Sequence, residues 1–345
     1  MLGVKQAMFR NVMAFERALG TGIIISSSVP ISQRVQKKIR AFIEEYERTL
    51  SRFRADSLVS RMASAEHGGE FEFPTWAQPL FALYSEFYAA THGAFDACIG
   101  ADLLALGYNN SVHFIPQSAA GLGKNENSSS DSWSNYRRAL PITWADISQG
   151  GGSTTLCTNQ PVQLDFGAAG KGYFVDLVTQ IIKEELSGDS RADFDFLVNA
   201  GGDMRACFSE ENNQIKVALE NPFDTTQAVG VASIASGALC ASSSARRRWK
   251  VKDANDFESN LIATHLINAL DGIPACDLCA SWAYVPSKTC DFPTAYADAL
   301  ATALFVSQES NLQKILQTTS AEFAVISPNH VLRKTRAFPA HFFAE

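Results

Sequence analysis

The sequence predicts an α+β fold, in which strand runs and separate helices pack around a large core. The chain has 345 residues, of which 46% are hydrophobic, enough for one large domain or two intimately packed ones. Short strands and turns over residues 192–249 indicate a mainly antiparallel sheet, while helical patterns lie before and after it. This order fits α+β better than a regular βαβ alternation.

The predicted elements follow in order along the chain. Residues 20–27 form a strand, and a helix begins near Ser32. Its apolar stripe recurs at helical spacing, as in a surface helix packed on a core: Val35, Ile39, Phe42, Ile43, Tyr46, Leu50 and Phe53. A second helix at 76–90 is ended by Gly93. Later elements are a buried strand at 162–166, a helix at 173–186, a partly buried strand at 276–284, and helices at 295–306 and 310–317.

A glycine-rich loop joins the strand at 162–166 to the helix at 173–186. Residues 164–173 read Leu-Asp-Phe-Gly-Ala-Ala-Gly-Lys-Gly-Tyr, with Lys171 at the start of the helix. Free N–H groups and the helix dipole favour an anion at such a place, although an ordinary tight turn explains the pattern equally well. The loop is not a Walker A motif, because Gly172 follows the lysine and Asp165 occupies the first glycine position.

Charge and hydropathy narrow the classes of partner. The net charge is -7, and the absence of a long basic run argues against nucleic acid as the main partner. An acidic protein that binds an anionic ligand must concentrate positive charge locally, as Lys171 and a divalent cation would do. No segment approaches the roughly 20 apolar residues that a membrane helix needs, and residues 1–17 show no signal-peptide core.

The seven cysteines are scattered along the chain, and we expect reduced thiols rather than a disulfide framework. A cytoplasmic protein is therefore predicted. Cys276 and Cys279 are spaced as in some zinc sites, with Cys290 and His265 nearby, but a second such pair is missing. Burial as small apolar residues is the preferred interpretation of these cysteines.

Five segments resemble one family in the same order along the chain. They are Thr-His-Gly-Ala-Phe-Asp at 91–96, the glycine-rich segment 164–176, Val-Asn-Ala-Gly-Gly-Asp at 198–203, His-Leu-Ile-Asn-Ala-Leu-Asp-Gly at 265–272, and Ala-Asp-Ala-Leu-Ala-Thr-Ala-Leu at 297–304. Together they resemble the motifs of the ApbE family of FAD:protein FMN transferases, from about Leu19 to the C-terminal region. Many bacterial members carry a lipid on a cysteine near the N-terminus, whereas the first cysteine here is Cys98. No membrane anchor is therefore expected.

The resemblance implies two related lobes of mainly antiparallel sheet flanked by helices, with the flavin nucleotide between them. Since motifs lie on both sides of the polar, serine-rich residues 109–138, we expect one domain, 1–345, with a flexible surface insertion there. The implied activity is Mg²⁺-dependent transfer of the FMN moiety of FAD to a threonine or serine hydroxyl of an acceptor flavoprotein, releasing AMP. An FAD pyrophosphatase and a non-catalytic FAD-binding protein are the alternatives.

Asp298 and Thr302 are four residues apart on a predicted helix, so their oxygen atoms face the same side and suit Mg²⁺, although a buried, hydrogen-bonded aspartate is the preferred interpretation from the residues alone. The resemblance supports that role and adds the backbone carbonyl of Gly170. It also identifies His265 as the catalytic base, for which a near-neutral pKa is suitable, with a structural histidine as the alternative. Asp203 is interpreted as a structural residue.

The resemblance further places flavin and nucleotide contacts along the whole chain. These predicted cofactor-binding residues are Leu19, Phe53, Ala94, Phe95, Asp96, Gly167, Lys171, Tyr173 and Ile267. Three positions depart from the family pattern: Phe53 replaces a common tyrosine, 241–243 replaces a Thr-Ser-Gly turn, and Ala269 replaces a proline. Residues 246–248 are three arginines, predicted to form a solvated basic face, with docking of an acidic acceptor or of the FAD phosphates as the alternative.

Overall fold

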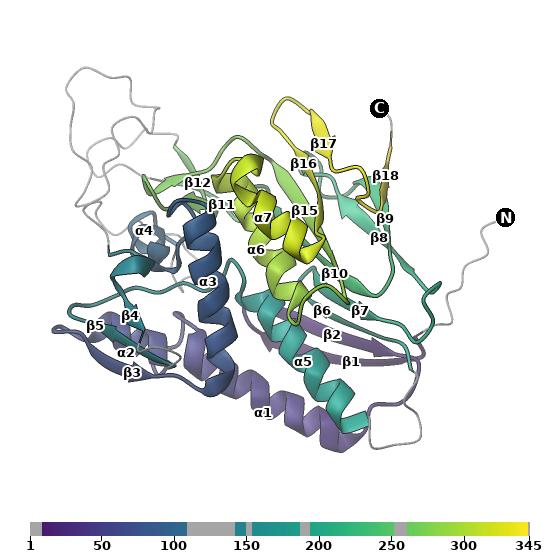
Figure 1. The fold of residues 1–345 in the computed structure, drawn as a ribbon, viewed down its shortest axis with the longest axis horizontal. Coiled ribbons are helices and arrows are strands. Elements are labelled where there is room, and N and C mark those ends of the chain that lie inside the picture. The colour runs from purple at the N-terminus through teal and green to yellow at the C-terminus, as the bar shows by residue number, and fades with distance from the viewer. Residues whose placement is uncertain (1–8, 109–141, 150–153, 187–193, 252–260, 344–345) are drawn as a thin grey trace.

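The computed structural model describes residues 9–108, 142–149, 154–186, 194–251 and 261–343. The predicted insertion at 109–138 lies outside the described residues. An eight-stranded antiparallel sheet with the strand order β1-β2-β6-β7-β10-β15-β16-β17 forms the centre (Figure 1). Its strands are β1 Asn11–Ala18, β2 Thr21–Ser27, β6 Phe196–Ala200, β7 Asp203–Cys207, β10 Gly237–Ser243, β15 Ala280–Pro286, β16 Glu322–Ile326 and β17 Leu332–Lys334.

Four smaller sheets accompany it in the part of the chain that the structure describes. The first two have three strands each: β8 Ile215–Glu220, β9 Ala228–Ile234 and β18 Ala340–Phe342, in the order β18-β9-β8, and β3 Gly69–Glu72, β4 Ser148–Gln149 and β5 Thr155–Thr158, in the order β3-β5-β4. Two-stranded ribbons pair β11 Arg248–Lys250 with β12 Ile262–Thr264, and β13 Ile267–Asn268 with β14 Ile273–Pro274. The predicted α+β class with a mainly antiparallel sheet is confirmed.

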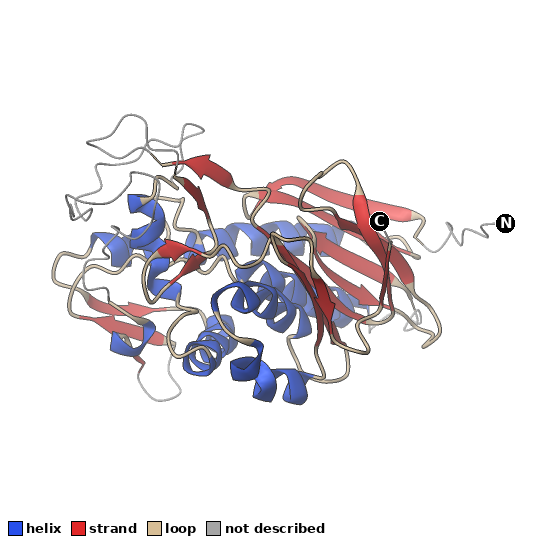
Figure 2. Cartoon of the chain, turned by 90° about the horizontal axis from the view of Figure 1, so that it is seen from above, coloured by secondary structure: helices blue, strands red, loops and turns tan. Residues whose placement is uncertain are grey.

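The helices gather against one face of the large sheet (Figure 2). The α-helices are α1 Gln33–Leu50, α2 Leu58–Ser64, α3 Gln78–Ala90, α4 Gly100–Ala105, α5 Gly170–Leu186, α6 Pro293–Val306 and α7 Gln313–Thr319. The short 3-10 turns are η1 Thr75–Ala77, η2 Ala97–Ile99, η4 Trp144–Asp146 and η5 Glu309–Leu312. None of the helices among the described residues is long and apolar enough to cross a membrane.

The alternation of side chains along the central strands buries both faces of the large sheet. Ala238 and Cys240 of β10 belong to the core beneath the helices. Leu239 between them packs instead with Leu219 and Trp282, in the core that the sheet shares with β8 and β9. The domain therefore has three layers: helices, large sheet and small sheet.

The first helix follows its predicted pattern closely. The Ser32 side chain accepts a hydrogen bond from the Val35 N–H at the N-terminus of α1, as an N-cap residue does. Phe53 follows the end of this helix and is 40% exposed, so it is not part of the buried stripe. Strand β1, which precedes the predicted strand 20–27, was not anticipated, because its polar residues obscure the alternating pattern.

Two other expectations need correction. Residues 162–166 form no strand, because their backbone N–H groups bind single partners, Met62 and Ala97, rather than a ladder. Helix α5 begins at Gly170, three residues before the predicted start. All seven cysteines are free thiols, but Cys276 is exposed and Cys279 half-buried, since both lie in the loop before β15.

Candidate functional site

A large open cavity of about 1310 Å³ lies where α1, α5, α6 and β10 converge. Most of the predicted site residues line it: Leu19, Phe53, Gly167, Gly170, Lys171, His265, Ile267, Asp298 and Thr302. Its volume exceeds the roughly 300–1,000 Å³ of ordinary ligand pockets, so it is large enough for more than one small molecule.

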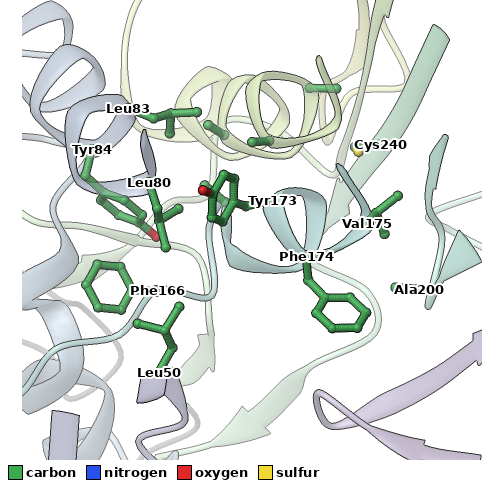
Figure 3. Close-up of a cluster of buried hydrophobic side chains, with 14 of the residues drawn as sticks. Leu50, Leu80, Leu83, Tyr84, Phe166, Tyr173, Phe174, Val175, Ala200 and Cys240 are labelled. Atoms are coloured by element: carbon green, nitrogen blue, oxygen red, sulfur yellow. The ribbon is translucent and has the colours of Figure 1, made fainter. Parts of the chain in front are cut away.

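The remaining predicted cofactor-binding residues, Ala94, Phe95, Asp96 and Tyr173, do not line this cavity. The Asp96 carboxylate is buried and accepts hydrogen bonds from the backbone N–H groups of Cys98 and Trp144. Tyr173 is also buried and donates its hydroxyl proton to the Trp76 carbonyl, and Figure 3 shows its ring within the core cluster. Their observed contacts are with other parts of the protein, and a role in binding the nucleotide stays a prediction.

Ala94 contributes through its backbone. Its carbonyl accepts a hydrogen bond of 3.0 Å from the Ala269 N–H. This bond ties the segment 91–96 to the segment 265–272, which carries His265 and Ile267 into the cavity. The motif at 91–96 therefore supports the cavity wall from behind.

One side of the cavity, the carboxylate wall, consists of Gly170, Lys171, Asp203, Asp298 and Thr302. The Lys171 ammonium lies 2.5 Å from the Asp203 carboxylate and 3.5 Å from that of Asp298. Both carboxylates are 3% exposed, so two buried acids share one cation. Burial alone would lower the pKa of Lys171, but the two carboxylates raise it above its usual range.

Asp298 has too little positive charge around it. Burial, followed by the neighbouring Asp203, raises the pKa of Asp298 to about 7, although Lys171 and the Gly172 N–H oppose this shift. The Gly172 N–H donates to Asp298 over 2.9 Å. A divalent cation beside this carboxylate would supply the missing countercharge.

The oxygen atoms around Asp298 fit magnesium. The Gly170 carbonyl accepts a 2.7 Å hydrogen bond from the Tyr46 hydroxyl and retains a second lone pair. The Thr302 hydroxyl lies 3.2 Å from that of Ser242. Carboxylate, hydroxyl and carbonyl oxygens are the ligands that this hard cation prefers. Within the described ranges, no group of three or more His, Cys, Asp or Glu side chains that could hold a metal ion occurs, at this site or elsewhere.

A buried ion pair behind the wall was missed by the sequence reasoning. Asp176 on α5 accepts hydrogen bonds from the backbone N–H groups of Thr294 and Ala295 and from the Thr294 hydroxyl. Arg205 lies 3.5 Å away, and burial raises the pKa of Asp176 to about 6. The pair fixes the N-terminus of α6, the helix that carries Asp298. The aspartate stands inside the motif at 164–176, but its hydrogen-bond partners on α6 lie more than a hundred residues away.

Gly172 allows α5 and α6 to meet. A Cβ atom at this position would lie 2.2 Å from the Thr294 carbonyl oxygen and 2.7 Å from the Asp298 Cβ. Only glycine therefore lets the first turn of α5 reach the Asp298 carboxylate.

His265 is half-buried, and its Nδ1 atom is fully buried without a hydrogen-bond partner among the described residues. Burial, followed by the charges of Arg247 and Lys171, lowers the pKa of His265 to about 3. The expected near-neutral pKa is therefore wrong for the ligand-free protein. The imidazole is therefore neutral at pH 7, although a hydrogen bond with the Arg247 backbone opposes the lowering of its pKa.

A second group of cavity-lining residues, the aromatic wall, consists of Arg52, Phe53, Tyr108 and Arg247. The Arg52 guanidinium lies 4.1 Å from the centre of the Phe53 ring and 4.9 Å from that of Tyr108, and it pairs with Asp165 at 2.5 Å. Arg247 donates to the Tyr108 hydroxyl over 2.8 Å. Sequence reasoning identified Phe53 here but missed Arg52 and Tyr108, because neither lies in a motif.

Leu19 reaches the cavity at the tip of the β1–β2 hairpin. Leu19 and Gly20 both have positive φ angles, 55° and 69°, between the paired residues Ala18 and Thr21. Leucine seldom adopts this conformation. The Glu47 carboxylate accepts the Leu19 N–H over 2.7 Å and so stabilises the turn.

Comparison with known proteins identifies the family and the fold. The profile of the ApbE family matches residues 19–326. No curated protein matches the sequence significantly. Among solved structures, the ApbE protein of Thermotoga maritima has a TM-score of 0.72 at 19% identity, covering 95% of this chain and 98% of its own.

Two further structures bear functional names. The flavinyl transferase ApbE of Pseudomonas stutzeri, solved in its apo form, has a TM-score of 0.64 at 20% identity and covers 96% of this chain and 97% of its own. The flavin transferase ApbE of Vibrio cholerae has a TM-score of 0.66 at 18% identity, covering 95% and 97%. The fold is shared over nearly the whole chain, and with the profile match across residues 19–326 the protein belongs to the ApbE family.

Proposed function

We propose that this protein is an FAD:protein FMN transferase, which moves the FMN moiety of FAD onto a threonine or serine hydroxyl of an acceptor flavoprotein. The carboxylate wall is the main support for this proposal. It offers oxygen ligands and surplus negative charge for a cation, and the neutral His265 lines the same cavity. Membership of the ApbE family and the names of the structural neighbours support the same activity.

The reaction exchanges one bond at phosphorus for another. The acceptor oxygen forms a bond to the FMN phosphorus, and the bond between that phosphorus and the bridging oxygen breaks. AMP leaves with the bridging oxygen, and the acceptor hydroxyl loses its proton. In-line positioning and neutralisation of the phosphate charge govern the rate of such a step.

The residues of the carboxylate wall have separate parts in this proposal. Gly170, Asp298 and Thr302 would hold Mg²⁺, which when bound supplies positive charge to the pyrophosphate. Lys171 is held by Asp203 at the edge of the same site and adds a point charge near the phosphates. Tyr46 fixes the Gly170 carbonyl, and Gly172 fixes the Asp298 carboxylate.

His265 is proposed to accept the proton of the acceptor hydroxyl. Its lowered pKa keeps the imidazole neutral before the reaction. The negative phosphates of bound FAD oppose the charges of Arg247 and Lys171, and so raise the basicity of His265 when substrate is present. Leu19, Phe53, Gly167 and Ile267 are proposed to contact the flavin nucleotide, since they line the same cavity.

Release of AMP alone does not identify the acceptor. The same site with water as acceptor would be an FAD pyrophosphatase, and a site without turnover would be an FAD-binding protein. The pairing of a proposed base with a proposed metal site favours catalysis over storage. We also propose that the protein is cytoplasmic, because its cysteines are free thiols.

The test is incubation of purified protein with FAD and Mg²⁺, with and without threonine-containing acceptor peptides, followed by quantification of AMP, free FMN and peptide-bound FMN. Transfer predicts equal amounts of AMP and peptide-bound FMN. Free FMN equal to AMP would establish the pyrophosphatase instead. Tight FAD binding without AMP would establish a binding protein.

A further inference from the structure

Strand β8 is an edge strand that forms part of the cavity wall. It stands at the end of the order β18-β9-β8, and among the described residues no strand pairs with its outer side. Val217, Ala218, Leu219 and Glu220 all line the cavity. An edge strand presents unpaired backbone groups that can accept another strand.

The hydrogen-bond register shows which residues face outward. The Ser233 N–H and the Val229 carbonyl of β9 bind Pro339 and Phe343, beside β18. The even-numbered residues of β9 therefore face β8, and their partners are Ile215, Val217 and Leu219. Lys216 and Ala218 consequently direct their backbone N–H and C=O groups away from β9, and both residues are exposed.

The charges at this edge favour an acidic partner. Lys216 stands in the middle of the outward-facing row, so a second copy of β8 would place like charges close together. At the end of the strand, Glu220 pairs with Arg246, whose side chain is 69% exposed. Such an exposed pair is weak and can exchange partners with an incoming carboxylate. Arg247 adds further positive charge in the cavity.

We propose that β8 binds the target segment of the acceptor as an added β-strand, with acidic residues flanking the threonine or serine that receives FMN. Main-chain hydrogen bonds to Lys216 and Ala218 supply affinity, and the adjacent positive charges supply selectivity. The added strand runs along the cavity that holds His265 and Asp298, so its hydroxyl reaches the reacting phosphorus. The inference rests on the proposed transferase function.

Two synthetic peptide pools with a fixed central threonine test the partner chemistry. The neighbouring positions are randomised among Gly, Ala, Val and either Asp or Lys. With FAD and Mg²⁺, we expect the Asp pool to acquire FMN at least roughly tenfold faster than the Lys pool. Equal labelling, or faster labelling of the Lys pool, overturns the charge argument. AMP release without any labelled peptide overturns the docking site but leaves hydrolysis, whereas absence of both products refutes the transferase itself.

The variant Ala218→Pro tests the edge directly. The backbone N–H of Ala218 makes no hydrogen bond to β9. Proline at this position therefore preserves the β8–β9 ladder and removes only an outward-facing donor. We expect transfer to the Asp pool to fall roughly tenfold or more, with FAD affinity unchanged. The matched control is Lys334→Pro on β17, the edge strand of the large sheet, whose N–H also faces outward because Arg333 and Thr335 face β16. β17 does not line the cavity.

N-methylation of single residues in the best-labelled peptide tests the added strand from the peptide side, even if Ala218→Pro fails to fold. A bound β-strand directs only alternate N–H groups toward its partner. Transfer should therefore be blocked when every second residue is methylated in turn, and be unaffected by methylation of the residues between them. Uniform tolerance along the peptide, or wild-type transfer by Ala218→Pro, would show that the acceptor binds elsewhere.

Discussion

The carboxylate wall and the aromatic wall face the same cavity but are built differently. In the first, buried carboxylates, one lysine and a glycine lie in close contact, and a second ion pair holds the helix behind them. In the second, Phe53 is 40% exposed, and arginines stack on rings that another side chain or a flavin could replace. From this difference we expect the first wall to hold its groups rigidly, whereas the exposed Phe53 ring of the second can shift when a ligand binds.

The largest effect should come from His265, which lies between the charges of both walls. His265→Ala should slow FMN transfer by about 10²–10⁴-fold, the usual contribution of a general base, while leaving FAD binding largely intact. Single-turnover rates and calorimetric FAD affinity measure the two quantities. Transfer at the wild-type rate would remove His265 from the mechanism.

The pH dependence sharpens this prediction. Because the pKa of His265 is lowered to about 3, kcat/KM should lose nothing through its protonation between pH 8 and 5. An ordinary histidine with a pKa near 6.5 would cost roughly thirtyfold at pH 5. The lowered pKa also means that the unfolded state binds more protons below about pH 6.5. The unfolding free energy of wild type should therefore fall relative to His265→Gln as the pH drops from about 6.5 to about 3.

On the carboxylate wall, Asp298→Asn should lower AMP release by about 10²–10³-fold, because the phosphate charge loses part of its compensation. The same change removes one of two buried carboxylates that share Lys171, so the metal-free variant should melt no lower than wild type. AMP release over a Mg²⁺ titration and thermal unfolding in a chelator separate the two effects. A variant that responds to Mg²⁺ as wild type does would place the metal elsewhere.

Gly172→Ala tests how rigid that wall is. The added Cβ would lie 2.2 Å from the Thr294 carbonyl oxygen, which belongs to backbone and cannot rotate away. We expect a loss of about 1–3 kcal/mol in unfolding free energy, with reduced turnover. Gly22→Ala is the matched control, since its Cβ would find no atom closer than 3.8 Å. Equal denaturation midpoints for the two variants would contradict the close packing of α5 on α6.

The sequence predicted the carboxylate wall better than the aromatic wall, for physical reasons. Asp298 and Thr302 share a helix face, so local periodicity brings them together, and both line the cavity. Arg52 and Tyr108 come together only through tertiary packing, and no spacing in the sequence predicts that a guanidinium stacks on a ring. Asp96 is assigned to the nucleotide by resemblance, and the structure adds that its carboxylate accepts two backbone N–H groups, which the motif did not reveal. A sequence motif marks the residues that matter, whereas their burial and hydrogen-bond partners show which contacts they make in the folded protein.

The smallest predicted effect on catalysis is that of a substitution on the aromatic wall, in contrast to those on the carboxylate wall. Tyr108→Phe removes the hydroxyl that accepts a hydrogen bond from Arg247 but keeps the ring against Phe53 and Trp249. A half-exposed neutral acceptor contributes little, so the KM for FAD should rise by less than about fivefold, with kcat unchanged. Tyr108→Ala removes the ring as well and should raise that KM further. If Tyr108→Phe instead lowered kcat as strongly as Asp298→Asn, the hydroxyl would act on the reacting groups through Arg247, and the aromatic wall would be as fixed as the carboxylate wall.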